Sequence, residues 1–411
     1  MKQENSLPQE QLWNIYNCHI HTFTQKNTPG QFYKLLLTDS HSGKMSPLKV
    51  VFVLLLPFLL IAFSPLILFM VILDYIRDGA ERNSADQNGR MQKVKKKAIN
   101  RLAALLAAIN PASDDLLERY ARFLNTSASD SQETIFKQIK HQYPENAKFV
   151  ILPMDMEFMN LGAMKQSIED QHADLLKLAA ATEGSIIPFY AVDPRHEDIV
   201  ERVKANLAKD KFRGIKIYPN LGYKPNHERL MDVYKICGDT YPVISHCSPS
   251  GIWQYGLSES DRINFGHPEN YIPVLKENKK LRLCLAHFGG AEEWVKHLKG
   301  QTPSTGDGRA WVRVISDMLT SGNYPNLYTD ISYTIFMPKV NGLYIDLVDY
   351  LKVLLSNKQI REHVLFGSDY YMVEQERISE KEASILLRSR LGEDLYRQIA
   401  YTNPRKFLGI K

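Results

Sequence analysis

Cysteine is scarce in this chain, which excludes a fold held by disulfides. Only four cysteines occur among 411 residues, and they lack the close pairing of a disulfide framework or a zinc knuckle. Reduced thiols are therefore expected. Cys18 and Cys247 each adjoin a histidine on an apolar run, and neighbours on a strand point to opposite faces. We expect both thiols to pack outward rather than to act as nucleophiles.

Positively charged residues are only in small excess over negatively charged ones. The formal net charge is +5 with 24% charged residues, and no basic repeat with interleaved aromatic residues occurs. Nucleic acid is therefore not an expected partner. The first ten residues are polar and show no apolar segment followed by a small-residue cleavage site. A secretory signal is not predicted, and a cytoplasmic location is expected.

From residue 148 onward, short apolar runs alternate with helix-length amphipathic segments. The expected strands, including one near the start of the chain, are 15–21, 149–153, 186–192, 214–218, 242–245, 281–286, 327–331 and 363–366. The expected helices include 165–182, 196–209, 226–238, 269–278, 309–321 and 344–356. Eight strand-helix repeats predict an α/β fold, a (β/α)8 TIM barrel. Residues 1–21 and 148–411 would form the barrel, with 22–147 as an insertion between strands 1 and 2.

Side chains with metal-binding groups stand at the ends of these strands or on them. They are His19 and His21 on strand 1, Lys216 on strand 4, and His246, His287 and Asp369 after strands 5, 6 and 8. Two histidines at i and i+2 of a strand point to the same side and can share a cation. Because catalytic groups of such barrels gather at the C-terminal ends of strands, the pattern predicts one catalytic metal site.

The insertion contains a long apolar run at residues 50–73. These 24 residues carry no charge, enough for a helix of ~36 Å that spans a bilayer. A simple crossing would separate His19 and His21 from the later ligands, basic residues flank both ends, and Pro57 and Pro65 break the run. The alternatives are a helical hairpin in one leaflet, a contact with a second copy, or a cap on the barrel; a membrane or a partner is favoured.

A basic segment follows this run. Residues 90–109 combine five lysines and arginines after position 92 with a Leu/Ala series that favours a helix. A basic amphipathic helix beside an apolar hairpin suits an anionic lipid surface, and would place the protein peripherally on the inner face of a membrane. A solvated helix packed by its Ala/Leu face is an equally good interpretation.

The ordered set of ligands resembles the amidohydrolase superfamily, in particular its amidohydrolase-related branch of metal-dependent hydrolases and decarboxylases. The resemblance covers residues 12–21 and 148–411, and includes Phe-Tyr-Ala-Val-Asp-Pro-Arg at 189–195, Leu-Ala-His-Phe-Gly-Gly at 285–290 and Asn-Pro-Arg-Lys-Phe-Leu-Gly at 403–409. Asn17 departs from the pattern, because many relatives have Asp there. The departure concerns the hydrogen-bond support of the first histidine pair and leaves the ligands themselves unchanged.

The resemblance implies two metal arrangements. With one ion, the ligands are His19, His21, His246 and Asp369, and His287 remains as an acid/base group. With two ions, a carboxylated Lys216 bridges them, with His19, His21 and Asp369 on one ion and His246 and His287 on the other. We favour one ion, with Lys216 as an ion-paired or substrate-binding amine. Nitrogen ligands with a carboxylate suit Zn²⁺ and also admit Mn²⁺, Fe²⁺ or Co²⁺.

The expected function is metal-dependent hydrolysis of a C-N or C-O bond in a small molecule. A bound cation lowers the pKa of water from about 16 toward neutrality, and Asp369 or His287 can take the proton. The alternatives are metal-dependent non-oxidative decarboxylation, as in the same branch, and a membrane-associated barrel protein without catalysis. Arg195, Tyr218 and Tyr370 stand at strand ends and are predicted to contact the substrate.

Overall fold

The computed structural model describes residues 13–32, 122–123, 125–304, 308–334, 347–375 and 378–410. In this part of the chain all strand pairing is parallel. The strands are β1 (Tyr16–Ile20), β2 (Lys148–Ile151), β3 (Ile186–Pro188), β4 (Tyr190–Ala191), β5 (Ile215–Ile217), β6 (Val243–Ser245), β7 (Leu283–Leu285), β8 (Leu327–Asp330) and β9 (Val364–Leu365). Each of the eight expected strands is present.

The strands close into a ring. β3 and β4 are two pieces of one strand that join the order β1-β2-β3 to the order β4 through β9. Between β9 and β1, the N–H of Cys18 donates to the carbonyl of Phe366 at 2.9 Å, and the N–H of Asp369 donates to the carbonyl of His19 at 2.8 Å. Gly367 permits this approach, because a Cβ there would lie 2.8 Å from the Cβ of His19. The predicted (β/α)8 barrel is confirmed.

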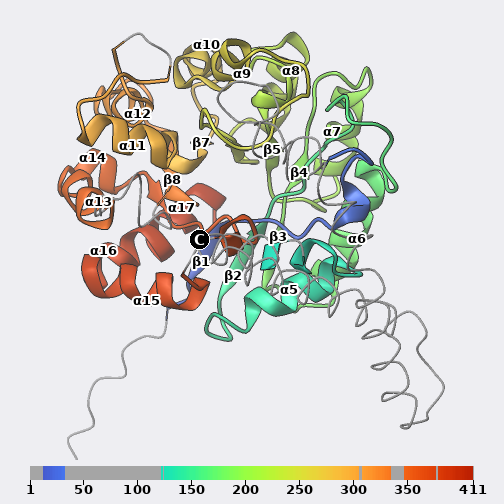
Figure 1. Cartoon of the computed structure of the whole chain (residues 1–411), viewed down its shortest axis with the longest axis horizontal. Helices are drawn as coiled ribbons and strands as arrows, with labels where there is room; N and C mark the ends of the chain where they lie inside the picture. Colours follow the sequence, from blue (N-terminus) through green and yellow to red (C-terminus); the bar gives the residue numbers. More distant parts are fainter. Residues whose placement is uncertain are drawn as a thin grey trace, which may run out of the picture.

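Helices surround the ring of strands (Figure 1). The α-helices are α5 (Gln132–Lys140), α6 (Ile168–Ala180), α7 (Ile199–Leu207), α8 (Glu228–Cys237), α9 (Glu259–Gly266), α10 (Ile272–Glu277), α11 (Ala291–Leu298), α12 (Trp311–Thr320), α13 (Leu347–Ser356), α14 (Lys358–Arg361), α15 (Glu380–Leu391), α16 (Glu393–Arg397) and α17 (Asn403–Leu408). Shorter turns are η1 (Gln25–Asn27), η2 (Pro219–Leu221), η3 (Pro268–Tyr271), η4 (Ala286–Gly289), η6 (Met372–Gln375) and the π-turn η7 (Gln398–Thr402). The expected helix at 269–278 divides into η3 and α10, and a proline stands at the first position of η3 and at the second position of α10.

The interior of the barrel has its own small core. Lys216 pairs with Ile244 and Ile244 pairs with Cys284, so these side chains face the same side of the sheet. Ile244 and Cys284 belong to a buried cluster that also contains Phe407 of α17. α17 lies near the middle of the ring in Figure 1 and packs against this inner cluster through Phe407 and Leu408.

Cys18 belongs to this inner cluster, so the prediction that its thiol packs outward is wrong. The register between β1 and β2 shifts between Asn17 and Ile20. An irregularity of this kind breaks strict alternation, so Cys18 and the next residue, His19, both face the barrel interior. Cys247 packs instead in the larger core between strands and helices, as expected.

The insertion is described only at its two ends. Its apolar run at 50–73 and basic segment at 90–109 lie outside the described residues, so the membrane or partner contact stays a prediction. Among the described helices, none is long and apolar enough to span a bilayer. Within the range 22–147, α5 packs beside β2, where the rings of Phe136 and Phe149 meet edge to face at 5.4 Å.

Candidate metal centre

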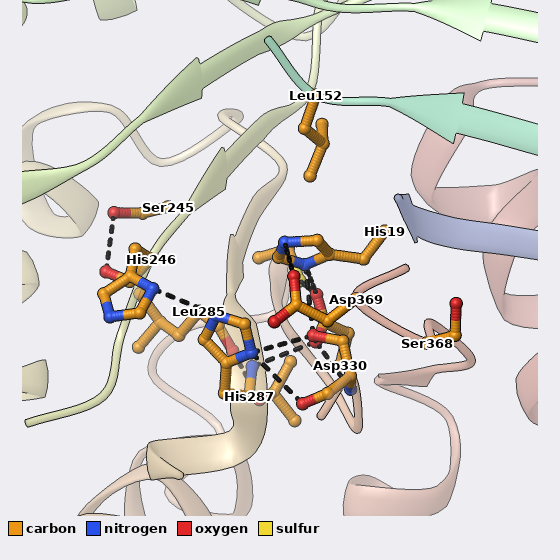
Figure 2. Close-up of polar contacts among 12 residues, drawn as sticks. His19, Leu152, Ser245, His246, Leu285, His287, Asp330, Ser368 and Asp369 are labelled. Atoms are coloured by element: carbon orange, nitrogen blue, oxygen red, sulfur yellow. Dashed lines mark hydrogen bonds and ion pairs between the residues drawn. The ribbon is translucent and has the colours of Figure 1, made fainter. Parts of the chain in front are cut away.

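The six ligand candidates converge at one end of the barrel, and all six are buried. β1 carries His19, and His21 follows it directly; β5 carries Lys216; the other three come from segments that follow β6, β7 and β9. Figure 2 shows the imidazoles of His246 and His287 facing each other, with His19 and Asp369 beside them. Side chains from five parts of the sequence therefore meet in one cluster.

His19, His21 and Asp369 form a compact group of three potential ligands. Oδ1 of Asp369 lies 3.1 Å from Nε2 of His21 and 3.5 Å from Nε2 of His19. Nζ of Lys216 lies 3.4 Å from the same Nε2 of His19. Two imidazole nitrogens, one carboxylate oxygen and an amine thus face one small space.

The other ring nitrogen of each histidine in this group has a fixed partner. Nδ1 of His19 lies 2.9 Å from Oδ2 of Asp330. Nδ1 of His21 lies 2.7 Å from the carbonyl oxygen of Leu152. A histidine that donates through one nitrogen presents the lone pair of the other, which is the usual support of a metal-bound imidazole. In both rings the presented atom is Nε2.

His246 and His287 form the opposite side of the cluster. Nδ1 of His246 lies 3.0 Å from Nε2 of His287. Their other nitrogens are engaged by Ser250, whose carbonyl lies 2.8 Å from Nε2 of His246, and by Ser332, whose hydroxyl lies 2.9 Å from Nδ1 of His287. The ring of Tyr218 stacks on His246 at 4.0 Å. The two inward nitrogens therefore point toward one another.

Asp330 is a site residue that the sequence reasoning missed. Besides His19, its carboxylate accepts the N–H of His287 at 2.9 Å and the N–H of Ser332 at 3.0 Å. It thereby links the strand end that carries His19 to the segment that carries His287. Asp330 is the last residue of β8, so the positional signal that identified the other ligands applied to it as well.

Burial favours the neutral form of three imidazoles in the cluster, those of His19, His246 and His287. Burial, together with the charge of Lys216, lowers the pKa of His19 to about 3. Burial likewise lowers the pKa values of His246 and His287. Burial also lowers the pKa of Lys216, to about 8. Neutral imidazoles next to a carboxylate are the protonation states that a divalent cation requires.

The backbone is constrained at two of these positions. His287 has φ of 65° and Asp369 has φ of 67°, both in the left-handed region that residues other than glycine rarely adopt. Such conformations persist where surrounding contacts hold them, and they cluster at functional sites. In His287 the contacts to Asp330 and Ser332 provide this hold.

The three expected substrate-contact residues lie in different surroundings. Tyr218 is part of the cluster through its stacking on His246. Arg195 forms a two-point ion pair with Asp193 and lies over the ring of Phe158. The hydroxyl of Tyr370 donates to Gln138 of α5 at 3.2 Å. The structure thus brings the side chain of Tyr218 to the candidate ligands. Tyr370 touches them through its backbone, where its carbonyl accepts the N–H of His21 at 2.5 Å, and the side chains of Arg195 and Tyr370 contact other residues.

Two further groups of potential ligands occur in the described part of the chain: one comprises His19, His287 and Asp330, and the other Asp155, Glu157 and His196. Nε2 of His196 lies 2.7 Å from the carboxylate of Asp155, and this hydrogen bond raises the pKa of His196. Asp155, Glu157 and His196 follow β2 and β4, neither of which carries one of the six ligand candidates.

The comparison with protein families decides between the resemblance and a chance pattern. A family model described as Amidohydrolase matches residues 155–410, which is more than half of the chain. The chain belongs to the amidohydrolase family. It is an enzyme of this family, and the resemblance seen in the sequence is confirmed. No curated protein matches this amidohydrolase in sequence.

Several solved structures are similar to this amidohydrolase. A 2,6-dihydroxybenzoate decarboxylase from Rhizobium has a TM-score of 0.48 at 14% identity, covering 71% of this chain and 92% of its own. An uncharacterized TIM-barrel protein from Bordetella bronchiseptica has a TM-score of 0.46 at 16% identity, covering 67% of this chain and 82% of its own. The 5-carboxyvanillate decarboxylase from Sphingomonas paucimobilis has a TM-score of 0.46 at 12% identity, covering 70% of this chain and 86% of its own. These activities are those of the matched proteins.

Proposed function

We propose that this amidohydrolase is a metal-dependent hydrolase that cleaves a C-N or C-O bond of a small molecule. The observation that carries the proposal is the orientation of four imidazoles. Each has one nitrogen engaged by a carboxylate, a carbonyl or a hydroxyl, and the other directed into the cluster with Asp369. Four imidazole nitrogens with one carboxylate match the ligands preferred by Zn²⁺.

We propose the following roles for these residues. His19, His21, His246 and Asp369 would hold one divalent cation. A bound cation supplies a water of lowered pKa and polarises the bond to be cleaved. His287 is then free to take or give a proton through Nε2, because Ser332 holds its Nδ1 and fixes the direction of the ring.

Metal analysis and substrate turnover test this proposal together. Protein grown without added metal would be assayed for Zn²⁺, Mn²⁺, Fe²⁺ and Co²⁺, then offered a panel of amides, lactones and aromatic carboxylates. We expect one transition-metal ion per chain, and proton release with an amide or a lactone that stops when a chelator removes the ion. Release of carbon dioxide from a carboxylate alone would assign decarboxylation instead. Protein that contains no stoichiometric metal and rebinds none would refute the metal site.

A further inference from the structure

Four polar side chains meet on the outer side of β1, away from the ligand cluster. They form what we call the polar ring, which consists of Asn17, Tyr143, Ser368 and Glu380. All four are buried, and Asn17 and Ser368 are fully enclosed. They come from β1, from the turn after α5, from the segment after β9 and from the first residue of α15. A buried polar group of this size needs a partner for each donor and acceptor.

The hydrogen bonds of the polar ring run in one direction. Nδ2 of Asn17 donates to the hydroxyl oxygen of Tyr143 at 3.2 Å and to that of Ser368 at 2.8 Å. The hydroxyl of Tyr143 in turn donates to Oε2 of Glu380 at 2.7 Å, and the hydroxyl of Ser368 also hydrogen-bonds this carboxyl. Asn17 is therefore the donor end of the ring and Glu380 is its acceptor end.

The donor end also holds the backbone next to two candidate ligands. Oδ1 of Asn17 accepts the N–H of His19 at 3.3 Å and the N–H of Ser368 at 3.1 Å. Ser368 immediately precedes Asp369, whose own N–H donates to the carbonyl of His19 at 2.8 Å. A rotation of the Asn17 amide would release both contacts. It would therefore shift His19 and Asp369 relative to each other.

The acceptor end is fixed by the start of α15. Ser379 caps this helix, with its side chain accepting the N–H of Glu382 and the carboxylate of Glu382 accepting the N–H of Ser379. Glu380 is the first residue after this cap, so its backbone position is set by the helix. Among the described residues no cation forms an ion pair with Glu380, and its Oε1 makes no hydrogen bond.

We propose that Glu380 is a positioning residue of the metal centre, and that Asn17 and Glu380 form a matched pair of opposite hydrogen-bond polarity. Through Tyr143 and Ser368, Glu380 sets the orientation of Asn17, and Asn17 sets the spacing between His19 and Asp369. The inference rests on the proposed metal site. It also explains why Asn rather than Asp stands at position 17. With Asp there, position 17 would supply no amide donor to the hydroxyls of Tyr143 and Ser368, and two buried carboxyls would face the same pair of hydroxyls.

A double-mutant cycle tests the pairing. The variants are Asn17→Asp, Glu380→Gln and the double variant, each measured for Zn²⁺ affinity by competition with a chromogenic chelator and for thermal unfolding without metal. We expect N17D to lower Zn²⁺ affinity by about 10–100-fold, the range for groups that orient ligands. E380Q alone should change it little, because its amide oxygen still accepts from Tyr143. The double variant should recover most of the loss, since the Gln amide then supplies the donors that a carboxylate at position 17 lacks.

Purely additive effects in the cycle, in both affinity and unfolding temperature, would overturn the pairing. If wild-type protein binds no Zn²⁺, the proposed function fails, whereas coupling in the unfolding temperature still tests the pair. Should N17D fail to fold, Tyr143→Phe replaces it, because it removes only the bridging hydroxyl. We expect Y143F to weaken Zn²⁺ binding. The matched control is Tyr396→Phe, whose buried hydroxyl bonds Ser384 instead, and equal affinities of these two variants would also contradict the proposal.

Discussion

Two buried carboxyl groups, those of Asp369 and Glu380, lie on opposite sides of β1, and their pKa values shift in opposite directions. On the inner side, burial would raise the pKa of Asp369, but the hydrogen bond with His21 and the fields of His19 and His287 hold it below its usual range. On the outer side, burial raises the pKa of Glu380 to about 8, and the hydroxyls of its partners do not offset this. Burial acts on both groups in the same direction, so the partners decide the outcome.

This difference in pKa corresponds to different roles of the two sides of β1. The inner side keeps a negative charge among neutral nitrogens, which is the arrangement a divalent cation needs. The outer side, where the pKa of Glu380 is about 8, is neutral at lower pH and holds the backbone through directed hydrogen bonds. A charge placed on the outer side, or removed from the inner side, should therefore have quite different consequences.

The largest effect is expected from removing the inner charge with Asp369→Asn. The variant keeps the size of the side chain but loses the anionic ligand. Metal affinity should therefore fall by more than the ~10–100-fold that outer groups contribute, and turnover should be lost. Metal content by elemental analysis checks this. His297→Ala, which removes an exposed histidine of α11, should keep wild-type metal content, and full metal content in D369N would refute its role as a ligand.

The second prediction concerns His287 and the number of ions. In the one-ion arrangement His287→Ala should retain the ion and lower kcat by about 10²–10⁴-fold, the usual contribution of an acid/base group. Stoichiometry and kcat would be measured on the same preparation. A fall from two ions to one would show instead that His287 is a ligand, and that the inner side holds a second cation between β6 and β7.

Much of the inner side could be predicted from the sequence. The apolar runs were specific enough to place eight strands, and in a parallel barrel the end of a strand is also the location of the site. His19, His21, His246, His287 and Asp369 meet because their strands end at the same rim. The positions of the strands and helices could be predicted without knowledge of side-chain packing, since the spacing of the apolar residues indicates them.

The orientation of Cys18, the role of Asp330 and the outer side could not be predicted in this way. Cys18 points into the barrel because β1 has an irregular register, and no residue of this apolar run indicates the irregularity. Asp330 stood at a strand end, but its partners come from β1 and from the segment after β7. Glu380 looks like an ordinary acidic residue in the first turn of a helix. Its role depends on Tyr143, which lies 237 positions away in the sequence, and through Tyr143 on the still more distant Asn17. Only the closed fold brings these residues together.

Asp330→Asn should have an intermediate effect on the inner side. The amide keeps the shape, but it no longer supplies the negative charge that fixes the ring of His19, so metal affinity should fall by about 10–100-fold. Competition with a chelator measures the change, and Asp232→Asn on the exposed face of α8 is the control. Unchanged affinity would mean that His19 is oriented by Ser332 and the strand alone.

The prediction for the outer side concerns the pH dependence of stability. The folded pKa of Glu380 is about 8, above its ordinary value of 4.5, so between these pH values the folded chain holds a proton that the unfolded chain has released. The stabilisation from this neutral form is full below pH 4.5 and is lost as pH rises through about 8. Its size is on the order of a few kcal/mol, and the acids Glu374 and Asp369 raise the pKa further. In denaturant unfolding from pH 5 to 8, the stability of wild type should therefore fall relative to that of Glu380→Gln, whereas the exposed control Glu133→Gln should follow the wild-type profile. Parallel profiles for all three proteins would show that Glu380 is ionised in the folded chain, and the contrast between the two carboxyls would then disappear.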